Sequence, residues 1–202
     1  MLRVLVLFFV LAAGPAAAQR AALAVLDAGA GPGDAIRLQA ALTDAGFAAT
    51  ALRSATPDTL RRAVAALPGE GGERFALILT GRFVHSARGA WFVPGIAARP
   101  TLATVHSVGI NLVTLAELAA LTPGGAALIL GEARGAAPGA GLADGIGPAA
   151  WLPRGVALVR GPADRVAAFA RADLLRPGEP LRTLVARRPG LTLAGPGDLR
   201  LV

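Results

Sequence analysis

Two apolar runs in the sequence end in residues that could form a chemical site. Phe75–Thr80 is followed by Gly81 and Arg82, and Ala126–Leu130 is followed by Gly131-Glu132-Ala133-Arg134. Short apolar runs of this kind are typical of buried strands in a parallel sheet. Open α/β sheets bind their ligands where such strands end. We therefore expect a site at these two strand ends, with two guanidinium groups and one carboxylate available to it.

The two strand-end motifs resemble those of a known peptidase family. In caspase-like cysteine peptidases, metacaspases included, one strand ends in Ser-Gly-His-Gly and the next in Asp-Ala-Cys-Arg. The corresponding places here read Thr80-Gly81-Arg82-Phe83 and Gly131-Glu132-Ala133-Arg134. A third segment, Trp91-Phe92-Val93-Pro94, is similar to the family's Tyr-Leu-x-Pro. The resemblance extends over residues 21–186 and implies the caspase-like fold.

The resemblance also implies that this chain lacks the catalytic pair of the family. A cysteine peptidase needs a thiolate that attacks the peptide carbonyl, and an imidazole that activates the thiol and protonates the leaving amine. Ala133 stands at the cysteine position, and the chain contains no cysteine. Arg82 stands at the histidine position, where a guanidinium stays protonated near neutral pH. We therefore expect a pseudopeptidase without catalytic residues.

Such a domain would bind its partner in the former substrate groove. The resemblance places Gly81, Arg82, Glu132 and Arg134 at the edge of this groove, beside the loop Gly135–Gly147, which corresponds to the mobile site loop of the family. Arg134 matches the family's arginine, and a salt-bridged strand-end residue is an equal interpretation of it. The family's acid falls on a glycine, so its selectivity for basic substrates does not carry over. The expected partner is a protein or a peptide.

The sequence leaves two other kinds of function to consider, a small-ligand binding module and a hydrolase of another class. The glycine-rich turn Gly29–Gly33 lies between an apolar run and a helical pattern, as a dinucleotide loop does. Its spacing is G-x-G-x-G, and the second strand ends in Leu52-Arg53 without an acid for a ribose, so we interpret it as a plain turn. A serine hydrolase would need a motif such as G-x-S-x-G, which is absent. A triad can still be assembled on paper from Ser86 or Ser107, His85 or His106, and Asp27 or Glu132.

The composition argues against metal, cofactor and nucleic-acid sites. The chain has no cysteine and two histidines far apart in the sequence, so we expect no metal site and no cofactor. Its formal net charge is +7, and all 20 basic residues are arginines. The arginines are scattered, with few aromatic residues between them, so we expect no nucleic-acid partner. Hydrophobic residues make up 54% of the chain, which is enough for a large buried core.

The first 18 residues predict a secretion signal. Arg3 is followed by the short apolar run Val4–Ala12, and Ala16-Ala17-Ala18 supplies small residues for cleavage before Gln19. The run is shorter than the ~20 residues that span a bilayer, so we expect no stable membrane insertion after cleavage. The expected location is the periplasm of a Gram-negative bacterium or the outside of the cell.

The rest of the pattern predicts one α/β domain over residues 19–202. Apolar runs alternate with helical patterns, which indicates a mostly parallel sheet with helices on both faces, plus a small β-hairpin. We expect strands at Ala21–Asp27, Phe47–Leu52, Phe75–Thr80, Ala126–Leu130 and Val156–Val159, and a hairpin of Arg82–His85 with Ala90–Val93. We expect helices to begin at Asp34 as N-cap, at Thr56-Pro57, at a capping box Thr114-x-x-Glu117, at Asp164 and at Pro180, with Leu191–Val202 as a tail.

Overall fold

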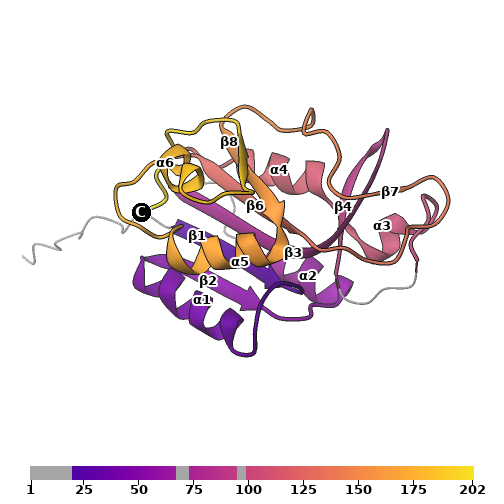
Figure 1. Cartoon of the computed structure of the whole chain (residues 1–202), viewed down its shortest axis with the longest axis horizontal. Coiled ribbons are helices and arrows are strands. Elements are labelled where there is room, and N and C mark those ends of the chain that lie inside the picture. The colour runs from indigo at the N-terminus through magenta and orange to yellow at the C-terminus, as the bar shows by residue number, and fades with distance from the viewer. Residues whose placement is uncertain (1–19, 67–72, 95–98) are drawn as a thin grey trace, which may run out of the picture.

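A mostly parallel sheet with helices on both faces forms the centre of the computed structural model (Figure 1). The structure describes residues 20–66, 73–94 and 99–202. The strands are β1 (Arg20–Leu26), β2 (Phe47–Leu52), β3 (Arg74–Ser86), β4 (Gly89–Val93), β5 (Ile110–Asn111), β6 (Ala126–Glu132), β7 (Ala143–Asp144), β8 (Val156–Pro162) and β9 (Thr192–Ala194). The helices are α1 (Asp34–Asp44), α2 (Pro57–Ala65), α3 (Val105–Val108), α4 (Leu112–Ala120), α5 (Ala163–Ala172) and α6 (Leu181–Ala186).

The main sheet has the strand order β2-β1-β3-β6-β8-β9. All neighbouring pairs in it are parallel except β8 and β9, which are antiparallel. The two strands expected to carry the site, β3 and β6, are therefore central neighbours whose carboxyl ends lie at the same edge. The predicted α/β architecture is confirmed.

Each central strand contributes side chains to two separate cores. Because neighbouring residues of a strand point to opposite faces, Leu77 and Leu79 of β3 pack on one side, while Ala76 and Ile78 pack on the other. The first core is covered by α2 and α4, and the second by α1, α5 and α6. Burial on both faces explains why these strands are apolar without alternation.

The predicted hairpin is confirmed, but it begins inside a longer strand than expected. β3 does not stop at Thr80; it continues through Ser86, pairs with β4 and also pairs with β7. Gly81 allows this because it lies under the ring of Phe92, where an added Cβ would be 2.9 Å from a ring carbon. The hairpin thus extends the central strand beyond the main sheet (Figure 1).

Of the five expected helix starts, those at Asp34 and Thr114 are wrong and the one at Thr56-Pro57 is confirmed, while α5 and α6 begin within one residue of the expected Asp164 and Pro180. Asp34 is the first helical residue of α1 and Gly33 is the N-cap, because the Asp34 carboxylate is used in a tertiary cluster described below. Asn111, not the Thr114-x-x-Glu117 box, caps α4: its side-chain oxygen accepts the N–H groups of Val113 and Thr114, at 2.7 and 3.4 Å. At α2, Thr56 caps the helix and Pro57 is its first residue, as predicted.

The end of the chain is more regular than the sequence indicates. The expected tail contains β9, which pairs with Val159 and its neighbours at the edge of the sheet. The secretion signal lies outside the described residues. Within the described residues, no helix is long and apolar enough to cross a membrane.

Candidate functional site

The carboxyl ends of β3 and β6 bring the two positions of the expected catalytic pair together. Gly81 lies opposite Glu132 in the parallel ladder, and the Ala133 N–H donates to the Gly81 carbonyl at 2.7 Å. Arg82 and Ala133, one residue further along each strand, are therefore neighbours at this edge of the sheet. The juxtaposition expected from the two motifs is present.

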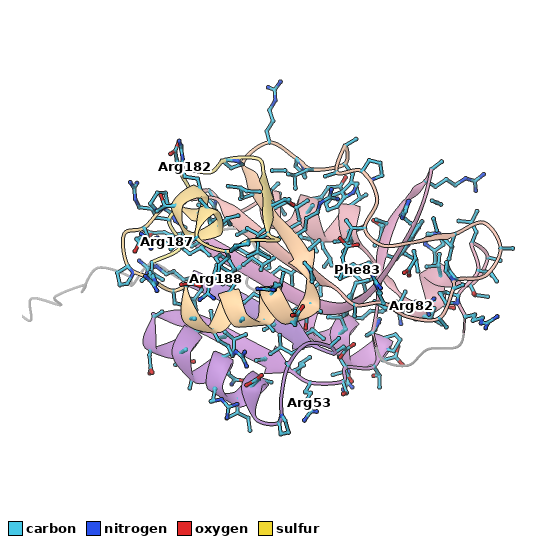
Figure 2. All side chains as sticks on the ribbon, viewed as in Figure 1. Arg53, Arg82, Phe83, Arg182, Arg187 and Arg188 are labelled. Carbon is cyan, nitrogen blue, oxygen red and sulfur yellow. The ribbon has the colours of Figure 1, made fainter. Side chains whose placement is uncertain are left out.

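Arg82 is tied to the loop that follows β6. Its Nη2 donates to the carbonyl of Ala136, and its side chain packs over Gly135, where an added Cβ would be 3.1 Å from the Arg82 Cδ and Nε. Its Nε is buried and has no partner among the described residues. Figure 2 shows Arg82 and Phe83 on β3, away from Arg182, Arg187 and Arg188. Arg82 thus positions the start of the loop.

The far end of the same loop is fixed by three side chains. Glu132 Oε2 accepts the Ile146 N–H at 3.1 Å, and His85 Nδ1 lies 3.1 Å from the Gly145 carbonyl. Arg160, from β8, donates to the Gly147 carbonyl at 2.8 Å. The loop that corresponds to a mobile element in the resembling family is therefore bound to β3, β6 and β8 by hydrogen bonds.

A cleft of about 650 Å³ opens at this edge, between the ends of β6 and β8 and the turn after β1. Glu132, Ala133 and Arg134 line it, and Asp144 and Asp164 add two further carboxylates. Arg134 is exposed and forms no ion pair or hydrogen bond with the other described residues. Of the four expected binding residues, Glu132 and Arg134 therefore face the cleft.

The other two expected binding residues are placed differently. Gly81 is buried beneath Phe92, and Arg82 lies against Gly135 and Ala136 rather than in the lining of the cleft. Sequence reasoning named the loop that contains Asp144 but not this residue, and it missed Asp164, which follows β8. The pairing of Asp144 with Val84 across β7 and β3 brings it to the cleft.

Gly131 explains why the acid of the resembling motif has no counterpart here. A Cβ at this position would lie 2.9 Å from Ala163 Cα, Thr80 Cγ2 and Val166 Cβ. Two of these atoms belong to α5, which covers β6 at this point. The close approach of α5 thus disfavours a side chain at this position, and a carboxylate-bearing one more strongly.

The geometry does not assemble the serine triads considered above. Ser86 Oγ accepts the Arg88 N–H at 3.0 Å, and His85 is bound to the Gly145 carbonyl. Ser107 Oγ donates to the Thr104 carbonyl at 2.8 Å, while the His106 ring packs edge-on against Trp91. Among the hydrogen bonds of residues 20–66, 73–94 and 99–202, none joins a serine to a histidine.

The glycine-rich turn after β1 is filled by the protein itself. Gly29 has φ +71° and lies so close to the start of α5 that a Cβ would be 2.4 Å from the Ala163 carbonyl carbon. The Gly31 N–H, which a phosphate would accept from, donates to Asp34 Oδ2 at 2.6 Å. The geometry therefore supports the interpretation as a structural turn.

Asp34, whose side chain is buried, forms an ionic cluster with two exposed arginines on this side of the sheet. Its carboxylate accepts from Arg37 at 2.5 Å and from Arg171 of α5. The Gly31 N–H, and then Arg37 and Arg171, lower the pKa of Asp34 to about 2. The cluster joins the start of α1 to α5, and its role is structural. In the part of the chain that the structure describes, no group of three or more His, Cys, Asp or Glu residues is placed to bind a metal.

Comparison with known proteins identifies a solved structure with a similar fold. No model of a known protein family matches this chain, and no curated protein matches it. Among solved structures, it is similar to the Drosophila initiator caspase Dronc, with a TM-score of 0.52 and 8% sequence identity. The similarity covers 90% of this chain and 80% of that chain. The expected caspase-like fold is confirmed at this level.

Proposed function

We propose that this chain is a secreted, catalytically inactive caspase-like domain that binds a protein or peptide at the strand-end cleft. The observation that carries the proposal is the pair Arg82 and Ala133. They occupy adjacent strand ends on a caspase-like sheet, at the positions where the resembling motifs have histidine and cysteine.

The chemistry of these two residues supports inactivity. The methyl group of Ala133 offers no nucleophile, and Arg82 offers no proton shuttle near neutral pH. The nearest hydroxyl in the motif, that of Thr80, is buried and donates to the Ala28 carbonyl at 2.6 Å. No other part of the chain can provide a thiol, because the sequence contains no cysteine.

The charges in the cleft favour a basic segment of the partner. Among the described residues, its lining holds three carboxylates, those of Glu132, Asp144 and Asp164, and the guanidinium of Arg134; Arg165, outside the lining, lies 3.9 Å from Asp164. This local excess of acid contrasts with a chain whose formal net charge is +7. Complementary charge would steer a basic segment to the cleft and orient it there.

Peptide turnover tests the inactive state. Wild type and the double variant Arg82→His plus Ala133→Cys are incubated with a mixed peptide library, beside a heat-killed control. We expect no wild-type cleavage above the control. Wild-type turnover that survives purification to constant specific activity would refute the proposal.

Binding is tested with a charge reversal in the cleft and a matched control. Asp164 is exposed and lies in the first turn of α5; Asp58 is exposed and lies in the first turn of α2, away from the cleft lining. Peptides selected from a display library on the wild type should be enriched in arginine and lysine. They should lose affinity for Asp164→Arg and keep it for Asp58→Arg. Equal losses in the two variants, or selection of acidic peptides, would contradict the proposed cleft.

A further inference from the structure

β2 forms an open edge of the main sheet. It stands last in the strand order, beside β1, and lies with α1 at the lower border of the molecule in Figure 1. Proteins protect such edges from pairing with charged residues, with proline or by keeping the edge strand very short. β2 has 6 residues, none of them charged or proline, whereas the opposite edge strand, β9, has 3. No described residue of β2 lines the strand-end cleft, so this edge is a separate surface.

The backbone groups that β2 directs outward follow from one hydrogen bond. Ala51 turns its N–H away from β1 and donates it to Gln39 Oε1 at 3.1 Å. Because alternate residues of a strand direct their backbone groups to the same side, Phe47 and Ala49 also direct theirs away from β1. Neither residue forms a backbone hydrogen bond on that side with the other described residues. The edge therefore offers the N–H and C=O groups of Phe47 and Ala49 to a further strand.

The side chains around this edge leave it open. Ala49 and Ala51 pack towards α1, so Ala48 and Thr50 lie on the other face of the strand, and both are exposed. On α1, Ile36 is 76% exposed. Residues three apart are neighbours on a helix surface, so Ile36 lies on the same side of α1 as Gln39, which reaches the edge. A large apolar side chain is thus exposed to water beside an unpaired strand.

Opposite charges stand at the two ends of the edge. Asp44 is the last residue of α1, before the start of β2, and Arg53 follows the end of β2. Both are exposed, and neither forms an ion pair or hydrogen bond with the other described residues. An antiparallel second copy of the same edge brings Arg53 of each copy towards Asp44 of the other. The edge is therefore complementary to itself in charge, which favours a second copy of this chain as its partner.

We propose that two copies of this chain associate through β2, with the strands antiparallel about a two-fold axis at Ala48. Phe47 of each copy then faces Ala49 of the other, and each such pair exchanges both of its N–H···O bonds. The Gln39 cap on Ala51 stays in place, because this register does not use the Ala51 N–H. The second α1 covers Ile36 from water, and the two main sheets become one continuous sheet.

The absence of cysteine from the chain allows a direct test of this register. Ala48 faces its own copy across the axis as a non-hydrogen-bonded pair, whose Cα atoms lie ~4.5 Å apart, within the ~4.4–6.8 Å that a disulfide needs. Ala48→Cys should therefore form a disulfide-linked dimer under mild oxidation. Thr50→Cys, exposed on the same face of β2, is the control. Its two copies would be more than ~13 Å apart, so it should not form the disulfide.

Sedimentation equilibrium measures the reversible association. The mass of the wild type should rise with concentration towards twice that of the monomer. Ala48→Lys places two like charges face to face at the axis and should raise the dissociation constant of the dimer at least ~10-fold. Ala194→Lys makes the same change at an exposed residue of β9, the other edge strand, and should leave the dissociation constant unchanged.

A charge swap tests the contact at the two ends. Asp44→Arg and Arg53→Asp should each weaken the dimer at least ~2-fold, and more at low salt, because each places like charges together. The double variant should recover the affinity of the wild type, a recovery that damage to the fold would not produce. Glu117→Arg reverses an exposed charge on α4 and is the control, with no expected change.

Amide exchange in the unmodified chain gives a readout that no substitution can disturb. The N–H groups of Phe47 and Ala49 should exchange more slowly in concentrated than in dilute solution. Those of Ala48 and Thr50 point to β1 and should not depend on concentration. A wild type that stays monomeric up to its solubility, or equal disulfide formation by Ala48→Cys and Thr50→Cys, would overturn the proposal. So would a dimer that Ala194→Lys dissociates and Ala48→Lys does not, which would move the interface to β9.

Discussion

Gly131→Ala inserts one methyl group where β6 meets α5, and its cost can be worked out from the contacts. The new Cβ would lie 2.9 Å from each of Ala163 Cα, Val166 Cβ and Thr80 Cγ2, against 3.4–4 Å for ordinary contact. None of these atoms is the end of a long flexible side chain, so relief requires α5 or β6 to shift. Overpacking of this kind costs ~1–3 kcal/mol.

A smaller effect acts in the opposite direction. Gly131 does not have a positive φ, so alanine can adopt its backbone conformation, and loss of glycine freedom in the unfolded chain stabilises by about 0.4–1 kcal/mol. The net expectation is a loss of about 1–2 kcal/mol of unfolding free energy. For a domain of this size that corresponds to a melting temperature lower by ~2–8 °C.

Urea unfolding followed by tryptophan fluorescence measures the change. Gly31→Ala is the matched control, because its Cβ would meet only Asp34 Oδ2, at an ordinary 3.6 Å, and it too lacks a positive φ. The control should be unchanged or slightly stabilised. Gly131→Asp should be worse than Gly131→Ala, since it also buries a carboxylate. A Gly131→Ala protein as stable as wild type would show that β6 has room for a side chain and that packing does not explain the missing acid.

Two further predictions follow from the described contacts, and a third follows from the sequence of the first 18 residues. The pKa of Asp34 is lowered from 3.8 to about 2 in the folded protein. The ionised carboxylate therefore stabilises the folded state above pH 4, and this contribution is lost as the pH falls to about 2. In urea unfolding, Asp34→Asn should be less stable than wild type at pH 7 and should show little of this pH dependence. Asn111→Ala should cost ~0.5–2 kcal/mol as a lost N-cap, whereas Glu117→Ala should stay within ~0.5 kcal/mol, and the reverse order in thermal unfolding would contradict the observed start of α4. N-terminal sequencing of exported protein should begin at Gln19, and an intact Met1 in the membrane fraction would contradict the secretion signal.

The sequence predicts the parts of the fold that local patterns determine. Apolar runs predicted the central strands, because a strand buried on both faces has no polar side, and Thr56-Pro57 predicted the start of α2 through the geometry of proline at the first helical position. It did not predict the role of Asp34, whose local context favours an N-cap. Its carboxylate accepts from Gly31 and Arg37 nearby and also from Arg171, 137 residues further along the chain, which only the packing of α5 on α1 brings near.

In the candidate site, too, some features follow from local sequence patterns and others from long-range contacts. The motifs placed Arg82 beside Ala133 because parallel neighbours end at one edge, a rule that depends on topology alone. Which side chains face the cleft depends on longer-range contacts. Asp144 reaches it through a short strand, β7, that has no sequence signal of its own, and Arg82 is turned to the loop by the carbonyl of Ala136.

If the chain is inactive, as proposed, the contacts of Arg82 and Glu132 show how these two residues are used instead. An active caspase-like site needs an imidazole at position 82 that is free to exchange a proton, so that side chain has to remain unencumbered. Arg82 is instead used to attach the loop at Ala136, and Glu132 attaches it again at Ile146. With a methyl group at position 133 there is no thiol for residue 82 to activate, so Arg82 can bind the loop without a cost to catalysis. The double variant Arg82→His plus Ala133→Cys therefore removes one attachment of the loop while it adds the two catalytic groups. If it gains turnover, the gain should be accompanied by faster proteolysis within the loop, and Arg82→His alone should show that faster proteolysis without any turnover.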